Sequence, residues 1–242
     1  MAHEDLYANI IENDSEFVEV FDSFAFGEVL ENTNLDNRNR MIVIISSLIA
    51  NQAIKPFKIM VEDALKDDIL TPIELKELTY QSFPYVGFGK AFDFLEVLND
   101  IFEENDNELP LDGQSTTTKE DRWQKGYEIQ CSFFGKEQID EMRKASPDDQ
   151  IHFQDFLSGY CFGDFYTREG LSNQDRELIT FSIIATLGGC ENQLRGHTAG
   201  NLSVGNDKDV LIGAVTVLCP FIGFPRTLNA LAIVNEIAGK LD

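Results

Sequence analysis

Long apolar segments that begin with polar residues alternate along the chain, and their spacing predicts helices. Residues 37–52 and 173–188 each start with side chains that can cap a helix and continue as mostly apolar runs. Residues 71–87 open with Thr71 and carry Glu74 three positions later, which is a capping-box pattern. Amphipathic patterns predict further helices at residues 89–104, 122–146 and 225–240. No hairpin signal stands out, so the sequence predicts an all-α fold.

The chain repeats itself at a constant offset of 136 residues. Four blocks recur without a gap, which indicates an internal duplication of residues 15–105 and 150–242. We therefore expect two similar helical domains, residues 1–105 and 122–242, joined by an acidic, exposed linker at residues 106–121. The blocks are FAFGEV (24–29) with YCFGDF (160–165), LDNRNR (35–40) with LSNQDR (171–176), PYVGF (84–88) with PFIGF (220–224), and LEVLNDI (95–101) with LAIVNEI (231–237).

Charge narrows the classes of partner. The 242 residues include 42 acidic and 19 basic side chains, a formal net charge of −23. A chain this acidic repels phosphate backbones and anionic membranes, so we expect no nucleic acid and no membrane among its partners, and a small molecule instead. The N-terminus lacks the pattern of a secretory signal, and the longest apolar run, residues 41–50, is too short to span a bilayer. The four cysteines have neither disulfide-framework nor zinc spacing, which predicts a reduced, cytoplasmic protein.

The two copies differ most where the second one carries chemically capable side chains. At the offset of 136, an apolar residue of the first copy faces a polar or reactive residue of the second at four positions. The first copy shows that the fold itself accepts apolar packing there, while unpartnered polar groups at the same places would cost roughly 1–3 kcal/mol each. A candidate site in the second copy follows. The pairs are Met41 with Glu177, Ile54 with Cys190, Phe57 with Gln193, and Val61 with His197.

Local signals suggest how the candidate site is built. Gly188 and Gly189 can end one helix, so that Cys190 enters the first turn of the next, where a helix N-terminus lowers a thiol pKa. His197 lies on the same helical face as Cys190 and about 10 Å further along the axis, so direct contact between them is not expected. Glu177 on the preceding helix can orient His197. The remaining cysteines, Cys131, Cys161 and Cys219, are expected in the core, and His3 and His152 on the surface.

The second copy resembles the carboxymuconolactone decarboxylase family, which shares its fold with the alkylhydroperoxidase D-like proteins. The residues that carry the resemblance are RELI (176–179), GCENQLRGH (189–197) and the segment from Leu211 to Ala230 that contains PFIGFPR. The first copy keeps PYVGFGKAF (84–92) and lacks the histidine, so it is similar to a degenerate member. The resemblance implies an all-α fold and a homo-oligomer, with a tandem chain forming a trimer that imitates a hexamer.

The family implies two chemistries. The first is decarboxylation of a carboxylated lactone or a related organic acid, with His197 handling the proton, Glu177 orienting it, Gln193 binding substrate, and Arg176 pairing with a carboxylate. Arg176 has a counterpart, Arg40, in the copy without a site, so a purely structural role is the alternative. The second is a thiol oxidoreductase or peroxidase centred on Cys190. In that chemistry Gln193 stands where a resolving cysteine is needed, so an external thiol would have to complete the cycle.

A third, non-enzymatic hypothesis is a ligand-binding oligomer whose polar face lines an interface. It predicts that His197→Ala changes the stability of the assembly and no turnover. For any of the three we expect no metal and no cofactor, because the sequence has only three histidines and no glycine-rich phosphate loop.

Overall fold

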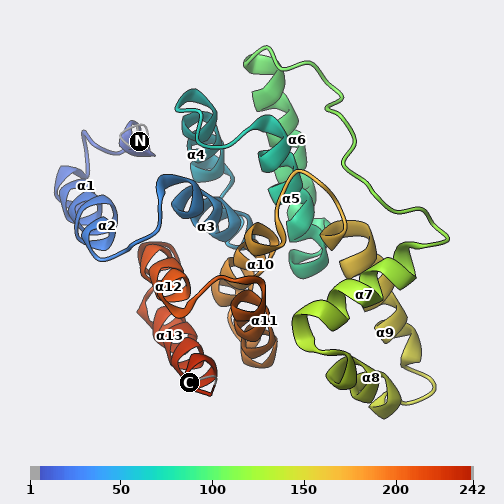
Figure 1. The fold of residues 1–242 in the computed structure, drawn as a ribbon. Helices are drawn as coiled ribbons and strands as arrows, with labels where there is room; N and C mark the ends of the chain where they lie inside the picture. The colour runs from blue at the N-terminus through green and yellow to red at the C-terminus, as the bar shows by residue number, and fades with distance from the viewer. Residues whose placement is uncertain (1–5, 241–242) are drawn as a thin grey trace.

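The computed structural model describes residues 6–240, and every regular element in that range is a helix (Figure 1). This confirms the all-α class expected from the sequence. The first half contains α1 (Ser15–Asp22), the π-helix η2 (Ser23–Glu28), α2 (Val29–Glu31), α3 (Asn37–Ala50), α4 (Ile54–Lys66), α5 (Pro72–Val86) and α6 (Phe88–Glu104). The second contains α7 (Arg122–Phe134), α8 (Lys136–Ala145), α9 (Ile151–Phe156), the π-helix η3 (Leu157–Tyr166), α10 (Asn173–Leu187), α11 (Glu191–Val204), α12 (Lys208–Ile222) and α13 (Phe224–Ala238).

Capping residues set the helix boundaries near the site. Thr71 and Glu74 form the predicted capping box at the start of α5, and Ser172 with Asp175 forms a second one at the start of α10. Helix α10 ends at Gly188, whose φ of +67° lies in the region that favours glycine. This confirms that the glycines stop the helix and turn the chain into α11.

The duplication is visible in the order of the elements. The series η2, α3, α4, α5, α6 recurs as η3, α10, α11, α12, α13, with a π-helix opening each copy. Helix α3 packs against its counterpart α10 in the middle of the molecule, and α5 also packs on α10 (Figure 1). Most buried apolar side chains of the two halves therefore share one hydrophobic core, and a second, smaller cluster consists of Phe133, Cys161, Phe162 and Tyr166.

The segment between the copies lies against the second one. Gln114 accepts a hydrogen bond from the backbone of Glu169, and the hydroxyls of Thr116 and Thr117 donate to the carbonyls of Thr167 and Gly163. These bonds tie the segment between α6 and α7 to the end of η3. The domain boundaries at residues 105 and 122 stay a prediction.

The backbones of helices α7 and η3 are in direct contact. A Cβ atom on Gly126 would lie 1.9 Å from the carbonyl oxygen of Ser158, and one on Gly163 would lie 2.1 Å from that of Arg122. Only glycine permits this approach. The contact fixes α7, whose last residues reach the candidate site.

Candidate active site

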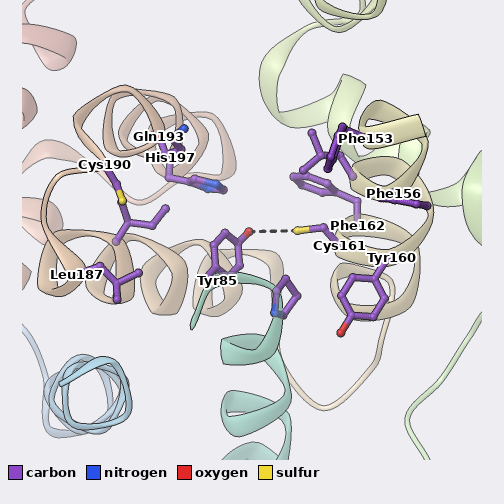
Figure 2. A pocket seen from close by; sticks show the side chains of 13 residues that line it. Tyr85, Phe153, Phe156, Tyr160, Cys161, Phe162, Leu187, Cys190, Gln193 and His197 are labelled. Carbon is purple, nitrogen blue, oxygen red and sulfur yellow. Dashed lines mark hydrogen bonds between the residues drawn. The ribbon is translucent and has the colours of Figure 1, made fainter. Parts of the chain in front are cut away.

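A cavity of about 550 Å³ lies between the end of α5, the α9–η3 segment, α10 and α11 (Figure 2). Phe153 and Phe156 form one wall, and Ile184 and Leu187 of α10 form another. The cavity is therefore assembled mainly by the second copy. The first copy adds the C-terminal end of α5.

His197 and Glu177 meet at this cavity. Glu177 is fully buried on α10, and its two carboxylate oxygens lie 3.1 and 3.0 Å from Nδ1 of His197 on α11. The His197 side chain is 12 % exposed and lines the cavity. Since Nδ1 faces Glu177, Nε2 is the ring nitrogen left for the cavity. A carboxylate held in this way selects the imidazole tautomer and stabilises an imidazolium.

The backbone makes room for the Glu177 carboxylate at Gly200. A Cβ atom at that position would lie 2.5 Å from Glu177 Oε2 and 3.0 Å from a ring carbon of Phe134. The Phe134 ring itself stands perpendicular to the His197 ring, with centroids 5.7 Å apart. A glycine on α11 and an aromatic residue of α7 thus fix the geometry of the pair.

A chain of hydroxyl groups extends behind Glu177. The Tyr166 hydroxyl donates to Glu177 Oε1 over 2.8 Å. Having given its one proton to Glu177, that oxygen accepts from the hydroxyls of Tyr85, 3.0 Å away, and Thr180, 2.8 Å away. Gln81 in turn donates to Thr180. All of these hydrogen bonds run towards the carboxylate, so the three hydroxyl groups form one chain that ends at Glu177.

Burial holds the two phenols in their protonated form. It raises the pKa of Tyr85 well above its usual value, with the charges of Cys161 and Glu177 adding to the effect. Burial also raises the pKa of Tyr166, with Glu177 next in importance. Both hydroxyls therefore remain hydrogen-bond donors at neutral pH.

Sequence reasoning missed Tyr85, Tyr166 and Thr180. The sequence did contain a signal for these three residues. At the offset of 136 each of them corresponds to an apolar residue of the other copy, and the same contrast identified His197. The pairs are Leu30 with Tyr166, Ile44 with Thr180, and Tyr85 with Phe221.

The other two predicted cavity residues come from α11 and the residue before it. Cys190 is the N-cap of α11, one position before the expected first turn, and is half-buried. Gln193 is exposed. Both line the cavity with His197, and no hydrogen bond joins the Cys190 thiol to another described side chain. Their roles stay a prediction.

Cys161 is buried as expected, yet it also lines the cavity. Its thiol donates to the Tyr85 hydroxyl over 3.6 Å (Figure 2), and burial raises its pKa to about 12. Cys219 is buried and His152 exposed, as predicted, whereas Cys131 is only half-buried. His3 lies outside the described residues.

Arg176 does not reach the cavity. Its side chain is fully buried and its guanidinium donates to Gln81, to Glu77, and to the backbone carbonyls of Arg168 and Glu169. Burial lowers its pKa. These partners give Arg176 a structural role, and it is not among the residues that line the cavity, where the sequence predicted its contact with a substrate carboxylate.

Two general findings bear on the class of site. Among residues 6–240, no three His, Cys, Asp or Glu side chains lie together in a way that could hold a metal ion. In the same range, no helix is both long and apolar enough to cross a membrane.

Comparison with known proteins places the chain in a family. The model of the carboxymuconolactone decarboxylase family matches residues 15–100 and again residues 152–236. The chain belongs to this family, and the two matches confirm its tandem form. The 4-carboxymuconolactone decarboxylase of Acinetobacter baylyi is 26 % identical over 118 residues, which cover 49 % of this chain and 87 % of that protein. Half of this chain thus corresponds to most of the relative.

Proposed function

We propose that the protein is a carboxy-lyase of the carboxymuconolactone decarboxylase type, which acts on a carboxylated lactone or a related organic acid. The observation that carries the proposal is the His197–Glu177 pair, with Nδ1 bound to a buried carboxylate and Nε2 left for the cavity. The family membership and the named relative support the same class of reaction.

In the proposed reaction, the bond between the substrate carbon and its carboxylate breaks and carbon dioxide leaves. The electron pair stays on the carbon as an enolate or carbanion, which must be neutralised. The imidazolium of His197 gives its Nε2 proton to that carbon, and solvent later restores the proton. Glu177 holds the ring in place and balances the imidazolium charge. Gln193 is the proposed hydrogen-bond donor to the substrate.

The test measures carbon dioxide release from a panel of carboxylated lactones, in heavy water as well as in light water. The wild-type protein should release carbon dioxide and introduce one deuterium at the carbon that lost it. His197→Gln should abolish both, while His152→Gln, a change at an exposed histidine, should abolish neither. A His197→Gln variant that turns over normally would sink the proposal.

A thiol oxidoreductase is the second candidate, and the position of Cys190 favours it. Cys190 is half-buried, lines the cavity and occupies the N-cap position of α11, where its thiol makes no capping hydrogen bond. In the proposed cycle a hydroperoxide oxidises Cys190 to a sulfenic acid and leaves as the corresponding alcohol, and two equivalents of an external thiol then restore the Cys190 thiol with release of water and a disulfide. Alkylation of Cys190 against pH, in wild type and His197→Ala, separates the candidates. A thiolate that forms well below pH 8.5 and depends on His197 favours the oxidoreductase. A Cys190 thiol with an ordinary pKa that does not depend on His197 would favour the lyase.

We also propose that the protein is a homo-oligomer, a trimer that imitates a hexamer. Exposed apolar side chains recur at the offset of 136, which a repeated interface would explain: Phe17 with Phe153, Phe88 with Phe224, and Phe92 with Leu228. Sedimentation of the full chain measures the mass directly. If His197→Ala weakens the assembly and no turnover is found for any acid, the protein is a non-enzymatic ligand-binding oligomer.

The four free cysteines fit the reducing cytoplasm, which we propose as the compartment of this protein.

A further inference from the structure

The cavity walls are mostly apolar. Aromatic and aliphatic side chains from α9, η3 and α10 supply most of the lining, and Figure 2 shows several of the rings facing the space beside His197. The lining contains no lysine and no arginine. The lining residues with polar groups are Tyr85, Tyr160, Cys161, Cys190, Gln193 and His197.

The arginines nearest in the chain serve other contacts. Arg176 is fully buried and its guanidinium is bound by Glu77, Gln81 and two carbonyls. Arg195, on α11 between Gln193 and His197, forms an ion pair with Glu236 at 3.0 Å. Arg226 is exposed, packs on Gly188, and lines a small hollow that shares Ile184 and Cys190 with the cavity wall, but it is not part of the cavity lining. His197 is therefore the one side chain of the lining that can carry a positive charge.

A single cation sets a limit on the charge of the ligand. One carboxylate can be neutralised by the imidazolium and accept a hydrogen bond from Gln193. A second carboxylate on the same ligand would find no second cation in the lining, and only the Tyr160 hydroxyl and the Cys190 thiol as further donors to replace its water. The net charge of −23 opposes a dianion further during its approach.

We propose that the cavity selects an apolar, ring-sized molecule that carries one carboxylate at most, and rejects a dianion of the same skeleton. The cavity volume of about 550 Å³ suits such a ligand. This inference rests on the proposed function for its substrate, and it narrows "organic acid" to a hydrophobic monocarboxylate.

The experiment titrates the full chain with three matched probes: phenylacetate, its 4-carboxy derivative, and phenylacetamide. The methyl signals of Ile184 and Leu187, observed by NMR, report binding inside the cavity. Phenylacetate should bind about tenfold or more tightly than the dianion. His197→Gln should weaken phenylacetate and leave phenylacetamide nearly unchanged, because the amide carries no charge to be neutralised.

A gain-of-function variant makes the test independent of loss of fold. Leu187→Arg places a guanidinium in the wall and should improve binding of the dianion by about tenfold or more relative to phenylacetate. Leu187→Met, the matched control, should leave that ratio unchanged.

Equal or tighter binding of the dianion by the wild-type protein would overturn the inference, and so would failure of all three probes to shift the two methyl signals at millimolar concentration. The proposed function fails separately. Binding of phenylacetate with no carbon dioxide released from any acid would refute the lyase and leave the ligand class standing. Turnover of a lactone with two carboxylates would support the lyase and refute the ligand class.

Discussion

The candidate site in the second copy and the corresponding region of the first copy occupy the same place in a repeated fold. The candidate site carries polar side chains, and the corresponding region is filled by apolar ones. In the first copy Met41, Phe57 and Val61 are fully buried and fill the space with carbon. In the second copy a glutamate, a glutamine and a histidine take these positions and a cavity is present. The fold therefore needs only apolar side chains at these positions, and its stability does not explain the polar residues of the second copy. A reaction or a bound ligand would explain them.

The comparison also separates what belongs to the fold from what belongs to the site. A π-helix opens both copies, so it is a property of the fold although η3 lines the cavity. Helices α7 and α8 come from the stretch before the second repeat and bring Phe134 onto the His197 ring. Tyr85 shows that the first copy still serves the site, because it supplies the end of the hydroxyl chain.

The largest effect is expected when the polar residues of the second copy are replaced by their apolar counterparts from the first copy. Glu177→Met with His197→Val reproduces the residues at Met41 and Val61. We expect turnover to fall by about 10²–10⁴-fold or more, because the proton-handling group is gone. The melting temperature should stay within a few degrees of wild type, because a buried ion pair can be replaced by apolar residues at little cost. Calorimetry and a turnover assay check both. Unfolding of this variant would mean that the polar set is structural.

Gly200 offers a sharper test of geometry. Its counterpart in the first copy is Ala64, and the counterpart of Glu177 is Met41, so both positions are apolar there and both are fully buried. Gly200→Ala puts a methyl group 2.5 Å from Glu177 Oε2 and should lower kcat by about tenfold to hundredfold by displacing the pair. Gly196→Ala is the matched control on α11, because nothing lies within 4 Å of its Cβ position.

The same variant can be rescued in a way that only this explanation predicts. Adding Glu177→Met to Gly200→Ala recreates the combination of Met41 and Ala64. The double variant should regain the melting temperature and remain inactive. A normal kcat in Gly200→Ala alone would contradict the proposed role of the Glu177 position.

Removing the Tyr85 hydroxyl should have a smaller effect. Tyr85→Phe takes one donor from Tyr166 and leaves the Glu177–His197 contact in place. The loss of one hydrogen bond is worth about 1 kcal/mol, so we expect kcat to fall about threefold to tenfold. Tyr160→Phe, an exposed tyrosine that lines the same cavity, is the control and should change little. Equal effects from the two variants would mean that the hydroxyl chain does not support the pair.

Local sequence rules predicted the helices and the pairing of Glu177 with the His197 helix. The capping box at Thr71 and the glycine stop after Leu187 are encoded within a few residues, so they were readable. The duplication gave each position a reference residue, which is why His197 stood out from an ordinary core histidine.

Side-chain direction and long-range contacts were harder to read. Arg176 and Glu177 are neighbours in sequence, but successive residues of a helix point about 100° apart, so only the glutamate turns to the site. Tyr85 and Tyr166 meet across 81 residues, and no local pattern reports that contact. Cys161 matched a small core residue, Ala25, and this concealed its place in the cavity wall.

The smallest effect that we expect is on the pH dependence of stability when Cys161 is replaced. Burial raises the pKa of the Cys161 thiol from 9.0 to about 12 in the folded protein, so the native state holds its proton longer than the unfolded chain does. The resulting stabilisation is complete below about pH 9 and is lost as the pH rises towards 12. Cys161→Ala, which installs the residue found at Ala25, removes this contribution. Its melting temperature should therefore fall less steeply than that of wild type over the same pH range.

The control for this prediction is Cys131→Ala, a half-buried thiol on α7. The buried phenols of Tyr85 and Tyr166 also make the native state sensitive to alkali in every variant. The informative quantity is thus the difference between the curves of variant and wild type. Parallel curves for Cys161→Ala and wild type would show that the thiol is not held neutral by burial, and that the cavity wall at Cys161 is wetter than its packing implies.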